Sequence, residues 1–158
     1  MSATNQGVYN YARQNSGSVV GNGQCWTLVE EALKDADGQT SNKLMKGKVT
    51  ANGDYVWGTL LGTQVQAQAK TLKLQPGDII QFRNYTCSQD GGDPDTRPHH
   101  SAIIASVNSD GSVEVYESNV PDGDLTVQKR TLYIRSGTVD DTSIKVTGKM
   151  WFYRPKPN

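Results

Sequence analysis

This 158-residue sequence lacks the features that mark several large classes of protein. It has only two cysteines and two histidines, so no disulfide framework can form and no Cys/His spacing suggests a metal site. Sixteen basic residues balance sixteen acidic ones, so the net charge is close to zero. Without an excess of positive charge to attract phosphates, we expect no nucleic-acid partner. No apolar run approaches the ~18 residues of a membrane span, so we expect none.

The N-terminus also lacks a recognisable targeting segment. MSATNQGVYN has neither the charged region nor the apolar region of a signal peptide. We therefore expect a cytoplasmic protein, or one that leaves the cell by lysis or a dedicated secretion route. The length is that of one domain over residues 1–158, and we expect a monomer that needs no cofactor.

Helix signals come first along the chain, and strand signals follow. The sequence predicts helices over Val8–Arg13 and from about Gln24 to Ala36, then a polar, irregular stretch over residues 39–64. A long polar loop is expected over residues 84–98. The predicted strands are Asp78–Phe82, Ser101–Val107, Ser112–Glu117, Leu125–Ile134 and Lys149–Tyr153. This order indicates an α+β fold, with N-terminal helices packed on an antiparallel sheet.

Cys25 begins the apolar face of the second predicted helix. Leu28, Val29 and Ala32 follow it at the spacing of one helical face. The unpaired N–H groups and the dipole at a helix N-terminus favour an anion, and they lower the pKa of a thiol. Cys25 is therefore a candidate nucleophile. The same pattern equally fits a small buried hydrophobic residue, which is what most free cysteines are.

A predicted hairpin gives His100 its candidate neighbours. A four-residue turn would pair Val107 with Ser112. His100 would then face Asn119, with Glu117 diagonally beside it on the same face of the sheet. A register shifted by one residue would move the set, and each of these residues also fits ordinary polarity at a strand end. A thiol at a helix N-terminus needs a base, however, and the base needs a partner that orients it.

Other candidate residues have simpler interpretations. His99 neighbours His100 but would point to the opposite face of the strand, because side chains alternate there. Cys87 lies in the expected polar loop without a helix or histidine beside it, so we expect it to play no part in a site. Trp26 could line a cleft beside Cys25, although packing is about equally plausible.

Four motifs in order resemble those of CHAP domains, the cysteine, histidine-dependent amidohydrolases/peptidases. Gly23-Gln24-Cys25-Trp26 resembles their GQC…W signature, and Gln75-Pro76-Gly77-Asp78 with Phe82 resembles their PGD strand opener. His100-Ser101-Ala102-Ile103-Ile104 looks like their H-x-A-hydrophobic strand, and Glu117-Ser118-Asn119 matches their E-x-N.

The resemblance implies a papain-like α+β fold and a cysteine peptidase or amidase. CHAP domains typically cut peptidoglycan, as N-acetylmuramoyl-L-alanine amidases or peptide endopeptidases, through a thioester. The resemblance implies Cys25 as nucleophile, His100 as base, and Glu117 and Asn119 as polar partners. An oxyanion hole would rest on the backbone N–H of Cys25 and the side chain of Gln24. The alternatives are a thiol hydrolase of the same fold acting on a peptide, isopeptide or acyl substrate outside the wall, or a non-catalytic binding module.

Overall fold

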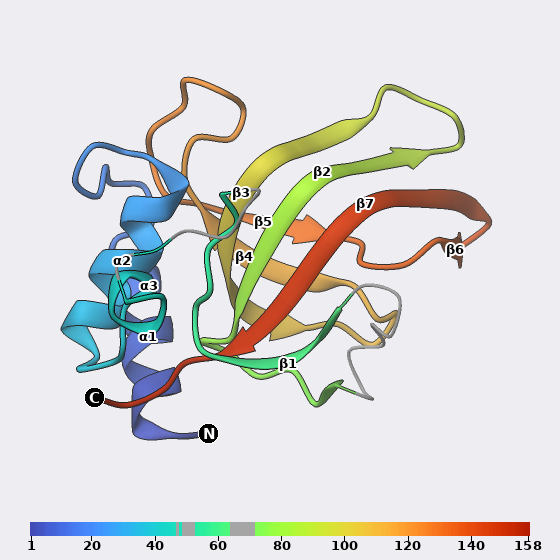
Figure 1. Cartoon of the computed structure of the whole chain (residues 1–158). Helices are drawn as coiled ribbons and strands as arrows, with labels where there is room; N and C mark the ends of the chain where they lie inside the picture. Colours follow the sequence, from blue (N-terminus) through green and yellow to red (C-terminus); the bar gives the residue numbers. More distant parts are fainter. Residues whose placement is uncertain (47, 49–52, 64–71) are drawn as a thin grey trace.

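The structure is a computed structural model that describes residues 1–46, 48, 53–63 and 72–158. Its helices precede its strands, and Figure 1 shows the helices gathered at one side of the sheet, so the predicted α+β class is confirmed. The elements are α1 (Ala3–Gln14), α2 (Cys25–Asp35), α3 (Ser41–Leu44), β1 (Thr59–Thr63), β2 (Ile79–Gln89), β3 (Asp95–Val107), β4 (Val113–Glu117), β5 (Gln128–Leu132), β6 (Gly137–Val139) and β7 (Thr142–Arg154).

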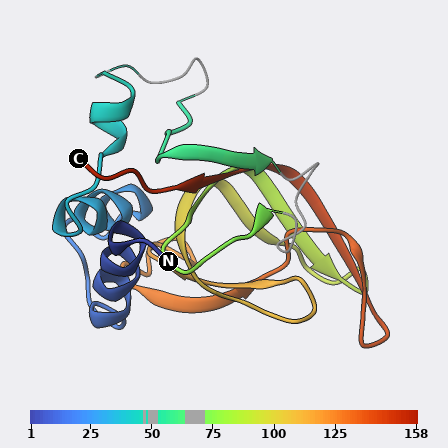
Figure 2. The ribbon, with the colours of Figure 1, turned by 90° about the horizontal axis from the view of Figure 1, so that it is seen from below.

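The described strands form one antiparallel sheet, as the sequence predicts. Its order is β1-β7-β2-β3-β4-β5, with β6 paired to β7. The three long strands β7, β2 and β3 lie at its centre, and Figure 2 shows how the sheet curves away from the helices. Within the described residues, no helix is long and apolar enough to cross a membrane.

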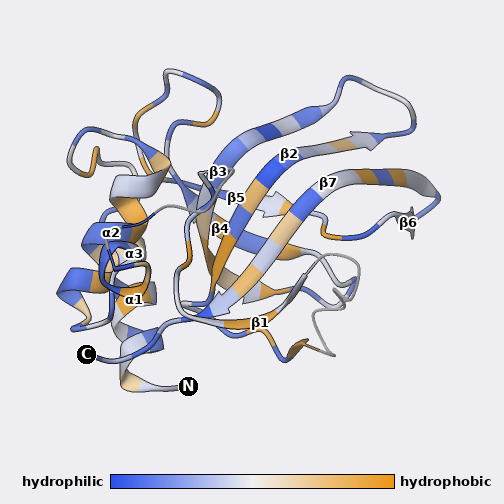
Figure 3. Cartoon of the chain, viewed as in Figure 1, coloured by the Kyte–Doolittle hydropathy of each residue, from blue (hydrophilic) through white to orange (hydrophobic). Residues whose placement is uncertain are grey.

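Two apolar clusters pack against the sheet. One contains the buried faces of α1 and α2, including Val8, Leu28 and Leu33, together with Ile79 and Ile103 of the sheet. The other is built from strand and loop residues alone, among them Ile80, Phe82, Ala102, Ile104, Val115 and Phe152. Figure 3 shows apolar and polar residues alternating along parts of β2 and β7, and the apolar ones there, such as Phe82 and Met150, belong to the second cluster. The helices therefore dock on one face of the sheet, and residues near this junction can form a site.

The predicted second helix is confirmed almost to its ends. Its apolar stripe is fully buried, and Cys25 is its first residue. The first helix begins five residues earlier than predicted, because Ser2 caps it by accepting a hydrogen bond from the backbone N–H of Asn5. Asn5 is buried despite its polarity, since its side chain donates to Asp78 over 2.9 Å. Hydrophobic periodicity could not reveal that polar first turn.

The polar loop expected over residues 84–98 is wrong, because this segment is a long β-hairpin. β2 runs on to Gln89 and β3 begins at Asp95, so only residues 90–94 connect them. β7 pairs with the other side of β2 in this region, with Cys87 opposite Val146. Asn84 has a left-handed φ of 52° where the pairing with β7 shifts, which interrupts the simple alternation that marks a strand.

The stretch over residues 39–64 is more regular than expected. It contains α3 and β1, while residues 47, 49–52 and 64 lie outside the described residues. The strand expected at Lys149–Tyr153 is the second half of β7, whose first half pairs with β6. Short polar elements such as β6 carry no clear period, so sequence patterning does not find them.

The predicted turn is wrong by one residue. Val107 pairs with Val113 rather than with Ser112, which lies in the turn. The register then shifts between Ile104 and Ser106, and Ile103 pairs with Tyr116 as the four-residue turn would have required. A bulge therefore compensates for the longer turn before the strand reaches His100.

Candidate active site

The first residue of α2 meets the middle of β3 and the end of β4 at the junction of helices and sheet. Cys25 comes from α2, His100 from β3 and Glu117 from the last position of β4. The Cys25 thiol is half-buried and shares a cleft with His100, whereas His100 and Glu117 are buried. The structure thus brings together three residues that the sequence singled out.

The surroundings of Cys25 favour its thiolate. Burial raises the pKa of the thiol, but the hydrogen bond and charge of His100 outweigh it. Hydrogen bonds from the backbone of Ser101 and Trp26 act in the same direction, so that the pKa of Cys25 lies below its usual value. Trp26 belongs to the first turn of α2, where backbone N–H groups have no partner within the helix. The helix start and the histidine therefore stabilise the same anion.

His100 is held between Cys25 and Glu117. Its Nε2 lies 2.8 Å from Glu117 Oε1. Burial raises the pKa of Glu117, but bonds from His100 and Arg97 lower it to about 2, so the carboxylate is ionised and can only accept. Nε2 of His100 therefore carries the proton, and Nδ1 is the nitrogen left for the thiol. Burial lowers the pKa of His100. The interactions with Cys25 and Glu117 raise this pKa by more than burial lowers it, so the pKa lies above its usual value.

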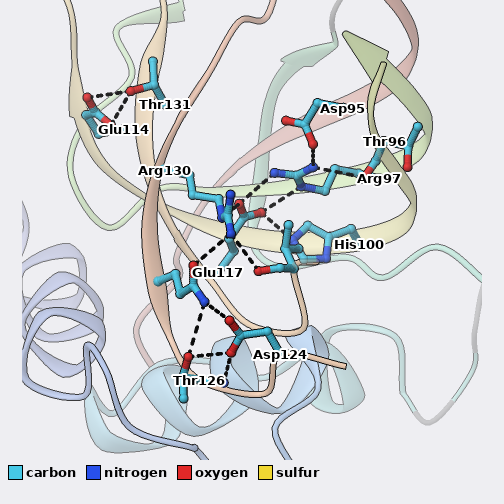
Figure 4. A network of polar contacts seen from close by, with 12 residues as sticks. Asp95, Thr96, Arg97, His100, Glu114, Glu117, Asp124, Thr126, Arg130 and Thr131 are labelled. Atoms are coloured by element: carbon cyan, nitrogen blue, oxygen red, sulfur yellow. Dashed lines mark hydrogen bonds and ion pairs between the residues drawn. The ribbon is translucent and has the colours of Figure 1, made fainter. Parts of the chain in front are cut away.

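Arg97 is a buried member of this site that sequence reasoning missed. Its Nε and Nη2 donate to the two oxygens of Glu117 over 3.0 and 2.8 Å, and its Nη1 bonds Asp95. Figure 4 shows Arg97 and His100 converging on Glu117, with Arg130 also nearby. Strict alternation along β3 would place Arg97 and His100 on opposite faces of the strand, and Arg97 fell in the expected loop. Arg97 is only 1% exposed, and nothing in the local sequence indicates that an arginine at this position is buried.

Asn119 does not contact the imidazole in this structure. β4 ends at Glu117, and Asn119 adopts a left-handed φ of 64° beyond it. Its Nδ2 donates to Gln24 Oε1 over 3.1 Å, and its Oδ1 accepts from the N–H of Gly123. Because the side-chain oxygen of Gln24 accepts this hydrogen bond, the NH₂ group of the same side chain is available to donate to a ligand oxygen. Asn119 thus lies beside the residue that precedes Cys25.

The remaining candidates lie around this site. Nε2 of His99 donates to the Gly53 carbonyl oxygen over 2.8 Å, and its ring packs on that of Tyr55. Cys87 lies in β2 rather than in a loop, and burial raises the pKa of its thiol. Trp26 is half-buried, with its ring centroid 6.1 Å from that of Tyr55. Both cysteines are free thiols.

A cleft of about 780 Å³ opens onto the thiol. Gln24, Cys25 and Trp26 form one side of it, and His99 and His100 the other. Residues 119–122 and Arg130 complete the rim beyond β4. Within the described part of the chain, no three His, Cys, Asp or Glu side chains gather so as to hold a metal ion. The groups present can deprotonate a thiol, hold an imidazolium and offer N–H donors to an oxygen beside the sulfur.

Comparison with known proteins gives one family. The family model of the AIM3/BBC1 cysteine proteinase-fold domain matches residues 3–158, which is nearly the whole chain. No curated protein and no solved structure matches the chain. The matched region contains every residue of the cleft described above.

Proposed function

The chain belongs to the family of AIM3/BBC1 cysteine proteinase-fold domains, and from this premise we propose that it is a cysteine-dependent hydrolase of amide bonds with a papain-like arrangement. The observation that carries the proposal is the series of interactions from the Cys25 thiol through His100 to the buried Glu117. A purely structural cysteine has no need of a lowered pKa, which a nucleophile requires.

In the proposed reaction, each of these groups has a role. Nδ1 of His100 takes the thiol proton, and the thiolate attacks the carbonyl carbon of the substrate. The oxyanion that forms accepts hydrogen bonds from the backbone N–H of Cys25 and from the Gln24 amide. The imidazolium gives its proton to the leaving amine as the carbon–nitrogen bond breaks, which leaves a thioester on Cys25. Water, deprotonated by His100, then attacks the thioester and releases the acid.

Glu117 and Arg97 act through His100 rather than on the substrate. Glu117 fixes the ring so that Nδ1 faces the thiol, and its charge stabilises the imidazolium. Arg97 holds both oxygens of Glu117 and keeps the carboxylate ionised. We therefore regard Glu117, Arg97 and Asn119 as positioning residues, and Cys25, His100 and Gln24 as the groups that meet the substrate.

For the substrate we propose first the amide bonds of peptidoglycan. The order of the CHAP-like motifs supports this choice, and the open cleft is large enough for a branched peptide. The same groups would serve a peptide, isopeptide or acyl substrate outside the wall, because they recognise only a carbonyl carbon and a leaving group.

Mass spectrometry of products separates these possibilities. The full-length protein is incubated with peptidoglycan and, separately, with a general peptide library. We expect new amine and carboxylate termini from one of the two, their loss in Cys25→Ala and His100→Ala, and their retention in His99→Ala. His99 is the matched control because it adjoins His100 and bonds a backbone carbonyl instead. No products from either substrate, or products that persist in Cys25→Ala, would contradict the proposal and favour a binding module.

A further inference from the structure

A second pocket, of about 350 Å³, adjoins the cleft. Trp26 and Tyr55 line both cavities, so these two rings form the partition between them. The rest of the second pocket comes from α2, from α3 and from the residues that follow α3, including Met45 and Lys48. Its volume lies within the range of about 300–1,000 Å³ that is typical of pockets for small ligands.

Glu30 lies in this pocket and is only 4% exposed. Its carboxylate accepts a hydrogen bond from the backbone of Ser41. Its Oε2, however, has no hydrogen-bond partner among the described residues. A buried carboxylate oxygen without a partner is costly, because it has lost its water and gained nothing in return. The contacts from Cys25 to Glu117 do not use Glu30, so the reaction does not explain this group.

The charges around Glu30 do not supply the missing partner. No ion pair joins Glu30 to another described residue, and Lys34 bonds Glu31 instead, over 3.1 Å. Burial raises the pKa of Glu30, and the more distant charge of Lys34 only partly opposes it. Tyr55 lines both this pocket, with Glu30, and the cleft, with Cys25.

We propose that this pocket is a specificity subsite that accepts a lysine-like side chain of the substrate, with its ammonium group bound to Glu30. This rests on the proposed function, because the substrate's backbone must occupy the neighbouring cleft. The aliphatic stem of the lysine would pack with the rings of Trp26 and Tyr55 on one side and the side chain of Met45 on the other. The ammonium would reach Glu30 Oε2 and lie near the aromatic faces, which also attract a cation.

Binding to the Cys25→Ala variant tests the subsite without turnover. The probes are Nα-acetyl-lysine amide and Nα-acetyl-norleucine amide, which differ in the terminal amine. Their binding is followed by the NMR shifts of the Trp26 indole N–H and the Glu30 backbone N–H. We expect the lysine probe to shift both signals and to bind roughly tenfold more tightly, the effect of about one charged hydrogen bond.

Two further variants identify the group responsible. Glu30→Gln, in the Cys25→Ala background, should reduce the preference for the lysine probe to about twofold or less. Glu31→Gln removes the same charge from the exposed side of α2 and should keep the preference. Circular dichroism checks that both variants fold. If Glu30→Gln does not fold, the comparison of the two probes on the parent protein still decides the question.

The outcomes are separate from those for hydrolysis. Equal affinity for the two probes, no shift with either, or a preference that survives in Glu30→Gln would overturn the subsite. Hydrolysis of peptidoglycan or peptides without any preference for a basic residue would leave the proposed function intact and remove this inference. A preference for the lysine probe without any hydrolysis would keep the lysine pocket and contradict the enzyme.

Discussion

At the scale of single residues, Glu117 is where most polar contacts of the site meet. His100 and Arg97 bond its two oxygens, and Arg130 lies 3.8 Å away. Its side chain is completely buried, so these cations replace the water that it loses on folding. The arrangement holds the pKa of Glu117 at about 2, so a negative charge lies behind the histidine at neutral and mildly acidic pH.

The pH dependence of activity should report this charge. Glu117 raises the pKa of His100, so Glu117→Gln should lower the pKa of the imidazolium. Activity needs the imidazolium, which is lost as the pH rises through its pKa, and the upper limit of the pH–rate profile should therefore move to lower pH. The profile is measured by hydrolysis. Glu114→Gln, on the same strand but bonded to Thr131, is the control that should keep the profile. An unchanged upper limit in Glu117→Gln would contradict the role of Glu117.

The two thiols should differ sharply in reactivity. His100 and the helix start lower the pKa of Cys25, whereas burial raises that of Cys87. Iodoacetamide at mildly acidic pH should therefore label Cys25 first, as followed by mass spectrometry of peptides. His100→Ala should slow labelling of Cys25 and leave Cys87 unaffected. Faster labelling of Cys87 in the native protein would show that the thiolate is assigned to the wrong residue.

At the scale of elements, the approach to α2 decides where the thiol lies. Gly23 has a left-handed φ of 79°, and an added Cβ would lie 2.5 Å from the Cβ of Leu125. Asn22 also braces the loop, since its Oδ1 accepts from the N–H of Gln24 and the hydroxyl of Thr27. The glycines before Cys25 therefore let the chain turn sharply into the helix against the segment that follows β4.

Replacing Gly23 should disturb this turn. Gly23→Ala combines an unfavourable φ with a steric clash, and we expect it to lower stability by about 1–3 kcal/mol. Because the turn also positions the helix start, alkylation of Cys25 at mildly acidic pH should slow as well. Gly91→Ala is the matched control for backbone strain, since Gly91 also has a positive φ but no neighbour within 4 Å of an added Cβ. Unfolding in urea gives the stability. Normal Cys25 reactivity in folded Gly23→Ala would show that the turn does not position the thiol.

The elements also show what sequence patterning can and cannot reveal. The apolar residues from Leu28 to Leu33 predict α2 well, because one buried face of a helix repeats apolar residues every three to four positions, a spacing that strands and loops do not share. The hairpin of β2 and β3 was missed, because its outer half is polar and Asn84 breaks the alternation. The predicted register places Glu117 diagonally beside His100, and it holds near His100 only because a bulge compensates for the longer turn. The contacts of Arg97 and Glu30 depend on tertiary packing that no local pattern encodes.

At the scale of the whole molecule, Asp78 ties α1 to the central strands β2 and β7. It is fully buried just before β2, and it accepts hydrogen bonds from Asn5 of α1 and from Arg154 at the end of β7. The N–H of Gln75 donates to its other oxygen over 2.8 Å. One carboxylate therefore joins three parts of the chain that are distant in sequence. The site depends on this junction, because Cys25 lies on the helical side and His100 on the sheet.

Removing this carboxylate should loosen the junction as a whole. Asp78→Ala leaves the Asn5 amide and the Arg154 guanidinium without their partner, and we expect a loss of about 3–5 kcal/mol in the free energy of unfolding. Urea denaturation followed by Trp fluorescence measures it. Asp93→Ala, at the exposed tip of the β2–β3 hairpin, should change stability by about 0.5 kcal/mol or less. A similar small change in Asp78→Ala would show that the packed apolar residues hold the two halves together unaided.

The division of the site between helix and sheet makes the thiol's reactivity conditional on folding. Cys25 is synthesised long before His100 and Glu117, and until the sheet forms it has neither the imidazole nor a stable helix start to ionise it. A nascent or unfolded chain therefore carries two ordinary, protonated cysteines at neutral pH. The thiolate that the proposed hydrolase requires can therefore form only once the sheet has brought His100 and Glu117 to the start of α2.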